Sequence, residues 1–280
     1  LLGIASIPSA GFRHGTITNR DELIERLEKA MTEAELMAST KVMKAILSIT
    51  GDHIRCLNTQ AAIVLNRASG VTGGLTERAI NDDDLFQVLD LAQAVSLPID
   101  RDILHTLPQE YLVDTLEEIK NPIGMTGRRL EGRVHLVTAA TTAMNNLVSC
   151  VEELGITVDG LVFQPLASAL ATLHKDEMEL GVTLVEIGSS TTNIAVYHGS
   201  AIRHSAIIPI GSSSITNDIA VMLQISIDEA EKIKMKYASA RASMSSPKLK
   251  IDLPSQAGQL ERSVPEQEVS RYVEARMLEI

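Results

Sequence analysis

Apolar segments of helical and strand character alternate from residue 141 onward, and this alternation limits the fold more than any other feature. Residues 143–155 and 166–173 have the composition of helices, whereas residues 158–165 and 181–188 have that of strands. Strands that alternate with helices form a mixed or parallel sheet whose faces the helices cover. The sequence therefore predicts an α/β fold.

Composition narrows the classes of function. The chain has 280 residues, 45% of them hydrophobic, which is enough for one or two cores. Aromatic residues make up 2% of the chain and there is no Trp, so platforms for stacking bases are not expected. The net charge of -11 repels phosphate backbones. We therefore expect no nucleic-acid partner.

Cysteine usage and hydropathy indicate a cytoplasmic protein. Cys56 and Cys150 lie far apart and match neither a zinc site nor a disulfide framework. No apolar run approaches the roughly 18 residues that a membrane span needs. The chain starts at Leu1 and stops within a helical pattern. We expect it to be a fragment that lacks both ends of a longer protein.

The first 74 residues contain a helix and two strands. Asn19 or Asp21 can cap a helix that runs to about Met37. Residues 41–50 and 53–58 flank Gly51 and Asp52, which predicts a β-hairpin. The Gly-rich stretch 61–80 is typical of a strand that leads into a flexible connection.

Residues 75–140 are predicted to form a compact α+β unit. Asn81 can cap a helix whose first turn carries three Asp residues, favourable at the positive end of the helix dipole. Residues 103–114 and 128–140 have strand patterns, joined by a turn-rich segment. The buried side of the helix is expected to contain Leu85, Val88, Leu89, Leu91 and Ala92.

The remaining segments extend the α/β pattern. Residues 201–210 read as a strand, and helices are expected near 215–223 and 227–237. The Pro-, Ser- and Gln-rich stretch 245–267 predicts a loop or a hairpin.

One segment, residues 184–197, has the composition of a phosphate-binding hairpin. An apolar strand enters and another leaves a turn of small polar residues. Gly188 permits close approach of an anion, and consecutive N–H groups can form a nest. Hydroxyl donors follow it at Ser189, Ser190, Thr191 and Thr192. Glu186 can hold Mg²⁺ through water, because hard cations prefer carboxylate oxygen. An ordinary hairpin with a polar turn is the alternative.

The neighbourhood of this hairpin resembles a known family. Residues 184–197 resemble the second phosphate motif of the actin, Hsp70 and sugar-kinase superfamily, usually written DxGGGTTD. Residues 160–173, with the stretch QPLASA, resemble the connecting motif of that fold as found in the FtsA family of bacterial cell-division proteins. Further stretches resemble FtsA segments in the same order: 8–19, 105–114, 119–139, 155–169, 205–223 and 229–240.

The resemblance implies a fold and a division into domains. It implies an actin-like α/β fold of two lobes with an FtsA-type α+β insertion. Residues 1–74 would belong to the first lobe, 75–140 to the insertion and 141–280 to the second lobe. No segment resembles the first phosphate motif, the adenosine-binding GG motif or the amphipathic membrane-anchoring helix of the family.

The resemblance also implies roles for individual residues, with ATP and Mg²⁺ as cofactors. The residues from Gly188 to Thr192 would contact the phosphates, Gly211 would lie near the nucleotide sugar, and Glu231 with Lys234 would flank base and ribose. Gln164 would orient the attacking water; a polar strand end before Pro165 is the alternative. Glu231 and Lys234 lie three residues apart on the expected helix, so an exposed ion pair is their alternative.

Four positions depart from the family pattern: Glu186, Ser189, Ser190 and Asn193 stand where it usually has Asp, Gly, Gly and Asp. A longer carboxylate and two added side chains change how closely phosphate and metal can approach. We therefore expect at most a weak ATPase.

By resemblance, the function is an ATP-binding scaffold. Such proteins polymerise on the cytoplasmic face of the membrane, tether filaments of the tubulin-like protein FtsZ through its C-terminal peptide, and recruit other division proteins. A basic stretch is expected either to dock that peptide or to be a solvated surface; it contains Lys232, Lys234, Lys236, Arg241, Lys248 and Lys250. Alternatives are a pilus-assembly adaptor of the same fold and a sugar-kinase-type phosphotransferase, whose catalytic Asp we do not find.

Two other groups of residues show weaker patterns. His53, His105, His135 and His204 fall in predicted strands without the spacing of a metal site, so we expect them to be structural. A paired-carboxylate hydrolase site is conceivable around one turn, but no substrate-binding signature accompanies its acids, Glu110, Asp114, Glu117 and Glu118.

Overall fold

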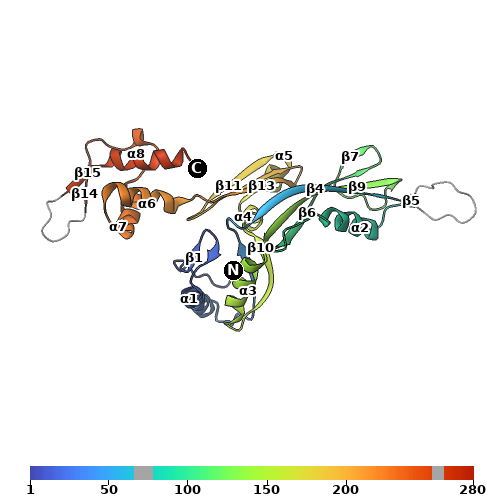
Figure 1. Ribbon diagram of the computed structural model, residues 1–280, viewed down its shortest axis with the longest axis horizontal. Helices are drawn as coiled ribbons and strands as arrows, with labels where there is room; N and C mark the ends of the chain where they lie inside the picture. The colour runs from blue at the N-terminus through green and yellow to red at the C-terminus, as the bar shows by residue number, and fades with distance from the viewer. Residues whose placement is uncertain (66–77, 254–261) are drawn as a thin grey trace, which may run out of the picture. The chain divides into compact units, whose positions relative to one another are not determined.

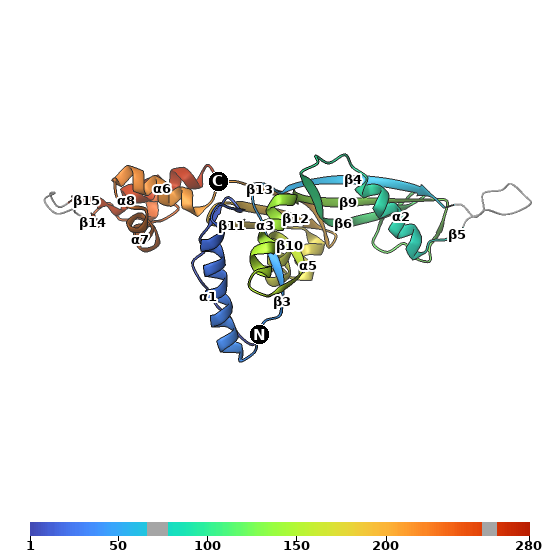
Figure 2. The same cartoon turned by 60° about the horizontal axis from the view of Figure 1, so that its bottom comes forward.

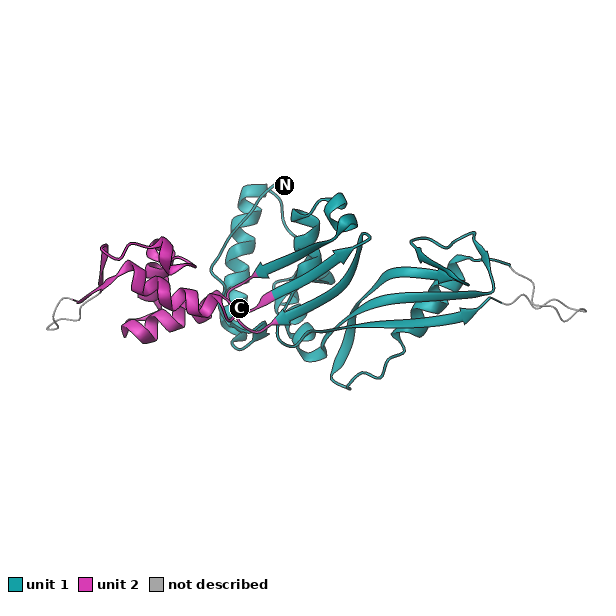
Figure 3. Ribbon diagram, turned by 90° about the horizontal axis from the view of Figure 1, so that it is seen from above, with its two compact units in different colours: residues 1–186, 193–207 teal, residues 187–192, 208–280 magenta. Residues whose placement is uncertain are grey.

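The computed structural model describes residues 1–65, 78–253 and 262–280 (Figure 1). Two compact units make up the chain, and the sequence passes between them more than once (Figure 3). The first unit comprises residues 1–186 and 193–207, and the second comprises 187–192 and 208–280.

A parallel strand pair organises the first half of the first unit. β3 (Lys44–Ile49) pairs with β10 (Thr157–Phe163). Their apolar side chains meet those of the helices around them in a core that includes Ile49, Ile54 and Phe163. The surrounding elements are β1 (Phe12–Arg13), β2 (Thr16–Ile17), α1 (Arg20–Ala38), α3 (Thr141–Glu152) and α4 (Gln164–Thr172).

The helix predicted to follow Asn19 is confirmed as α1. The Asn19 side chain accepts a hydrogen bond from the backbone N–H of Glu22 at 3.3 Å, which satisfies one of the unpaired amides at the helix start. The helix ends where Ser39 adopts a left-handed conformation with φ of 52°. In Figure 2, α1 stands beside the β3–β10 pair.

Another part of the first unit is an antiparallel sheet with strand order β4–β9–β6–β7, whose strands are labelled in Figure 1. α2 packs on its β4 and β9 side. Asn81 caps the start of α2, as the sequence predicts, and Asp84 completes a capping box that was not predicted. The core between them contains Val88, Tyr111 and Leu130. The elements are β4 (Arg55–Val64), β5 (Arg78–Ala79), α2 (Asp82–Gln93), β6 (Arg101–Val113), β7 (Leu116–Ile119), β8 (Thr126–Gly127) and β9 (Arg129–Ala140).

The predicted hairpin over residues 41–58 is wrong, although both of its strands exist. β3 pairs with β10 in parallel, whereas β4 pairs with β9 in an antiparallel register. Gly51 and Asp52 instead form a corner between two sheets, where the Asp52 N–H donates to the carbonyl of His14 at 3.1 Å. Local turn chemistry predicted a local partner, but distant strands with larger apolar faces pair with both segments.

Three further expectations need correction or lie outside the description. Leu91, expected on the buried side of α2, is 46% exposed. His53 lies in the corner after β3 and not in a strand. The expected flexible connection falls largely on residues 66–77, and part of the 245–267 stretch falls on residues 254–261; both ranges lie outside the described residues.

A third sheet has the order β11–β12–β13. Ala169 of α4 packs in one apolar core with Ala195 and Tyr197 of β12, and this core joins α4 to the sheet. A short helix, α5, precedes the sheet and was not expected from the sequence, because its six residues are too few to show a period. The bounds are α5 (Lys175–Leu180), β11 (Val182–Ile187), β12 (Thr192–His198) and β13 (Ala201–Ile208).

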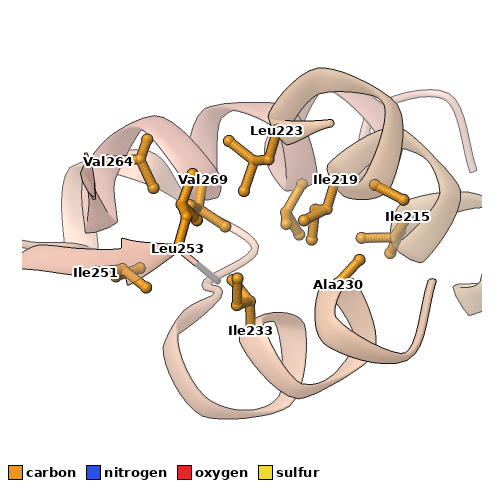
Figure 4. Close-up of a cluster of buried hydrophobic side chains, with 11 residues drawn as sticks. Ile215, Ile219, Leu223, Ala230, Ile233, Ile251, Leu253, Val264 and Val269 are labelled. Carbon is orange, nitrogen blue, oxygen red and sulfur yellow. The ribbon is translucent and has the colours of Figure 1, made fainter. Parts of the chain in front are cut away.

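The second unit is a small helical body with a two-stranded ribbon. Its core joins Ile219 and Leu223 of one helix to Ile233 of the next and to Val269 of the last (Figure 4). The predicted hairpin is confirmed where it is described, because β14 and β15 pair antiparallel. The elements are α6 (Ser212–Leu223), α7 (Ile227–Tyr237), the 3₁₀ helix η1 (Ala242–Met244), β14 (Lys250–Leu253), β15 (Arg262–Pro265) and α8 (Glu266–Met277).

Within the first unit, a buried histidine joins β9 to β13. His135 is 1% exposed, and its two ring nitrogens contact Asn58 Oδ1 at 2.6 Å and Ser205 Oγ at 2.7 Å. Burial, with a smaller contribution from the charge of His204, lowers the pKa of His135 to about 4. The folded chain therefore holds this ring neutral, which confirms a structural role for the residue.

We predict that His135 makes stability depend on pH. In the unfolded chain the imidazole binds a proton below about pH 6.5, whereas in the folded chain it does so only near pH 4. Stability is therefore lost as pH falls through this window, by up to about 3 kcal/mol in all. Denaturant unfolding between pH 4 and 7 should show a smaller pH slope for His135→Gln than for the unchanged protein, and an equal slope would contradict the prediction.

Candidate functional site

The residues predicted to bind nucleotide fall into two groups, one in each unit. Gln164 and Glu186 belong to the first unit. The others belong to the second unit: Gly188, Ser189, Ser190, Thr191, Thr192, Gly211, Glu231 and Lys234.

Residues 188–191 form a tight turn between β11 and β12, which we call the phosphate turn. The Gly188 N–H donates to the Thr191 carbonyl at 2.9 Å and closes the turn. Thr191 and Thr192 are buried, and Ser189 is exposed. The Thr192 hydroxyl donates to the carbonyl of Ile210 at 2.8 Å, so its proton serves to anchor the turn.

The phosphate turn rests on the N-terminus of α6. The backbone N–H groups of Ser212 and Ser213 donate to the carbonyls of Gly188 and Ser189 at 2.9 and 2.8 Å. The Ser213 hydroxyl donates to the Ser189 carbonyl as well, at 2.7 Å. These bonds satisfy amides that a helix start leaves unpaired.

This contact sets the direction of the amides in the turn. In a planar trans peptide the C=O of one residue and the N–H of the next point in opposite directions. Because the carbonyls of Gly188 and Ser189 both point to α6, the N–H groups of Ser189 and Ser190 both point away from it. Two successive N–H groups on the same side form the concave donor arrangement that binds anions.

Gly211 makes the contact possible. A Cβ atom at this position would lie 2.6 Å from the carbonyl oxygens of both Gly188 and Ser189. Such a distance is far inside a normal van der Waals contact, so a side chain would displace the phosphate turn. The turn and the start of α6 approach this closely because residue 211 has no side chain.

Glu186 is the centre of a hydrogen-bonded network in the first unit. Its Oε1 accepts from Gln164 Nε2 at 2.7 Å and from Ser168 Oγ at 2.8 Å. Its Oε2 accepts from Asn193 Nδ2 at 2.9 Å. The structure thus places the predicted water-orienting and metal-binding residues in direct contact.

Sequence reasoning missed Ser168 and Thr50 as members of this network. Ser168 follows Gln164 by four residues on α4, so helical spacing alone places both side chains on one face. Thr50 donates its hydroxyl to Asn193 Oδ1 at 2.7 Å. It is 143 residues away in sequence, and no local signal indicates the contact.

Glu231 and Lys234 form an ion pair on α7, and Lys234 also contacts Thr216 of α6. Lys234 Nζ lies 2.7 Å from Glu231 Oε2 and donates to Thr216 Oγ1 at 2.9 Å. Burial acts to raise the pKa of Glu231, but hydrogen bonds from Lys234 and Thr216 outweigh it and hold the pKa below its usual value. The side chain of Lys234 is 13% exposed and that of Glu231 is 46% exposed, so the two residues do form the ion pair of the alternative, with the lysine turned inward.

The carboxylates considered for a hydrolase site have other partners. Glu110 lies between Arg133 and Arg203, at 2.6 and 3.0 Å. Burial raises its pKa, but the two arginines have the larger combined effect and lower it. Within the described residues, no group of three or more His, Cys, Asp and Glu side chains is arranged to hold a metal ion.

Comparison with protein families matches two parts of the chain. Residues 183–278 match the model of cell division protein FtsA, and residues 51–138 match the SHS2 domain inserted in FtsA. Over its full length the chain is 39% identical to cell division protein FtsA of Pseudomonas aeruginosa and 32% identical to that of Bacillus subtilis. The chain belongs to the FtsA family. It spans 65% of the first relative and 62% of the second.

The FtsA assignment agrees with the fold. A solved PilM–PilN type IV pilus biogenesis complex superposes with a TM-score of 0.59 over 82% of this chain and 60% of that one, at 14% identity. The chain therefore has the actin-like α/β fold with the inserted SHS2 domain of FtsA, as the sequence predicts. The inserted-domain match begins near β4, before residue 75; the predicted boundaries between domains stay a prediction.

Across the parts of the chain that the structure describes, no helix is long and apolar enough to cross a bilayer.

We predict that Gly211→Ala destabilises the second unit. The added methyl group must displace the phosphate turn, and overpacking of this kind costs about 1 to 3 kcal/mol. Gly160→Ala is the matched control, because a Cβ there meets no atom within 4 Å. Denaturant unfolding of both variants measures the difference, and equal stability would contradict the role given to Gly211.

Proposed function

We propose that this chain is part of an ATP-binding cell-division scaffold. The observation that carries the proposal is the phosphate turn on the N-terminus of α6. Its carbonyls face α6 and its successive amides face the other way, which suits a polyphosphate. Gly188 and Thr191 would cradle the phosphates together with the hydroxyls of Ser189 and Ser190. Thr192 anchors the turn beside them.

The remaining predicted residues fit supporting roles. Glu186 offers one carboxylate, which suits a Mg²⁺ ion held through water together with nucleotide phosphates. Gln164 donates its amide N–H to Glu186, so its carbonyl oxygen is directed away from the carboxylate and can accept from a water. Gly211 would lie near the sugar, and Glu231 with Lys234 near base and ribose. The expected enzyme is at most a weak ATPase.

The proposed partners are those of a division scaffold. The protein would polymerise on the cytoplasmic face of the membrane through the inserted domain, bind the C-terminal peptide of FtsZ and recruit other division proteins. A helix outside these residues would anchor it to the membrane. Similarity to FtsA proteins along the whole of this chain supports this function over a pilus-assembly adaptor, whose likeness is limited to the fold. A sugar-kinase function would need a catalytic Asp, and we identify none among the described residues.

Exposed cations of the second unit are the proposed docking surface for the FtsZ peptide. Lys234 is excluded from this basic surface by its burial against Glu231 and Thr216. Lys236 lies 5.0 Å from the centre of the Tyr237 ring, so the surface also offers an aromatic group. The basic surface consists of Lys232, Lys236, Arg241, Lys248 and Lys250.

We predict that Gly188→Val with Thr192→Ala abolishes ATP binding by the full-length protein. A Cβ at residue 188 would lie 3.0 Å from the Thr191 carbonyl oxygen, and loss of the Thr192 hydroxyl removes the anchor to Ile210. Equilibrium binding of a fluorescent ATP analogue measures the effect. Unchanged affinity would refute the phosphate turn as the site.

We predict that Lys232→Glu with Lys236→Glu weakens binding of an FtsZ C-terminal peptide at least about tenfold. Reversal of two charges removes attraction to the peptide carboxylates and adds repulsion. Fluorescence anisotropy with a labelled peptide measures the affinity, and Lys29→Glu, at an exposed position on α1, is the control. Failure of the unchanged full-length protein to bind the peptide would refute the division function.

A further inference from the structure

The ammonium group of Lys234 uses all of its hydrogen-bond donors within the second unit. A protonated lysine has three N–H donors and no acceptor. Nζ donates to Thr216 Oγ1 at 2.9 Å and to the Ser212 carbonyl at 3.3 Å, and it lies 2.7 Å from Glu231 Oε2. Each of the three donors therefore has a partner. In this arrangement Lys234 has no donor left for the base or the ribose of a nucleotide.

The Ser212 carbonyl connects this ammonium group to the phosphate turn. Ser212 is the first residue of α6, and the peptide group that carries its C=O also carries the N–H of Ser213. That N–H donates to the carbonyl of Ser189 at 2.8 Å. The peptide group of the Ser189 carbonyl in turn carries the N–H of Ser190, which faces away from α6. A chain of hydrogen bonds thus runs from the lysine through two peptide groups to an amide of the concave donor arrangement.

A charged donor at one end of such a chain strengthens the bonds along it. Hydrogen bonds from an ionised donor are roughly twice as strong as those between neutral groups. Each polarised peptide group makes its own N–H a better donor, by about 10 to 30% per bond. Little water competes for these bonds, because the Lys234 side chain is 13% exposed and Thr216 is 2% exposed. Lys234 therefore both holds the first turn of α6 in place and increases the donor strength of the phosphate turn.

We propose that Lys234 is a positioning residue for the phosphates of the nucleotide and acts on them through Ser212 and the phosphate turn. This inference rests on the proposed ATP-binding function and deepens it, because it separates the roles of Glu231 and Lys234. The Glu231 side chain is 46% exposed and stays available near the ribose, whereas Lys234 turns inward to α6. Loss of the ammonium group therefore weakens the binding of phosphates and leaves the binding of adenosine unchanged.

The first test compares two parts of ATP as ligands of the full-length protein. Tripolyphosphate contains the phosphates alone and adenosine contains the base and ribose alone, and the inhibition constant of each is measured by displacement of a fluorescent ATP analogue. Lys234→Met keeps an unbranched side chain and removes its donors. For this variant we expect tripolyphosphate to bind at least about fivefold more weakly and adenosine to bind within about twofold of the unchanged protein. Lys29→Met, at an exposed position on α1, is the control and should change neither constant.

The two inhibition constants together separate a positioning role from a direct contact and from general damage to the site. A loss for adenosine alone would show that Lys234 contacts base or ribose, and an equal loss for both ligands would show that the whole site is loosened. Either result overturns the inference, and so does unchanged binding of both ligands. If the unchanged full-length protein binds no ATP, the proposed function is refuted together with the inference.

The second test keeps the ammonium group and removes one of its partners. Thr216→Val has a similar shape but no hydroxyl, so it removes one anchor of Lys234 and the bond from Thr216 to the Ser212 carbonyl. We expect tripolyphosphate to bind at least about threefold more weakly while adenosine is unaffected, because the lysine charge is retained and only its position changes. Unchanged binding of tripolyphosphate overturns the positioning role. If Lys234→Met does not fold, Thr216→Val decides the inference alone.

Discussion

The close approach of two backbones at Gly211 is the constraint on which the candidate phosphate site depends. The carbonyls of Gly188 and Ser189 bind the first amides of α6, and this requires a residue without a side chain at the helix start. The direction of those carbonyls sets the direction of the amides that follow them. A donor arrangement suited to phosphate is thus a consequence of how the turn packs on the helix.

The network around Glu186 shows how distant segments build one group of side chains. Gln164 and Ser168 come from α4, Glu186 from β11, Asn193 from β12, and Thr50 follows β3. Three neutral donors orient the carboxylate, and the carboxylate in turn orients two amides. Because the folded chain has already ordered these groups, little further conformational entropy is lost when a ligand binds to them. Within the first unit, the network joins Thr50, which precedes the inserted domain in sequence, to Glu186 and Asn193, which lie on either side of the phosphate turn in sequence.

Local patterns predicted elements well where the signal lies within one segment. The caps at Asn19 and Asn81, the strands that became β6 and β9, and the helices α6 and α7 follow from periodicity and capping residues. The same reasoning failed for the partner of β3, because the turn at Gly51 and Asp52 carries no information about a strand more than a hundred residues away. It raised the Glu231–Lys234 ion pair but could not show that Lys234 also donates to Thr216, since that partner comes from another helix.

By itself, the sequence determined the α/β class, the FtsA resemblance and the position of the phosphate turn, because small polar residues between two apolar strands form a local, contiguous signal. Tertiary structure decided which way the turn faces, what holds Glu186, and which basic residues stay exposed. Those properties depend on hydrogen bonds between residues far apart in sequence, and only the folded chain brings such residues within about 3 Å of each other. The resemblance therefore predicted a nucleotide site. The contacts of Gly211 and Asn193 show which residues shape that site.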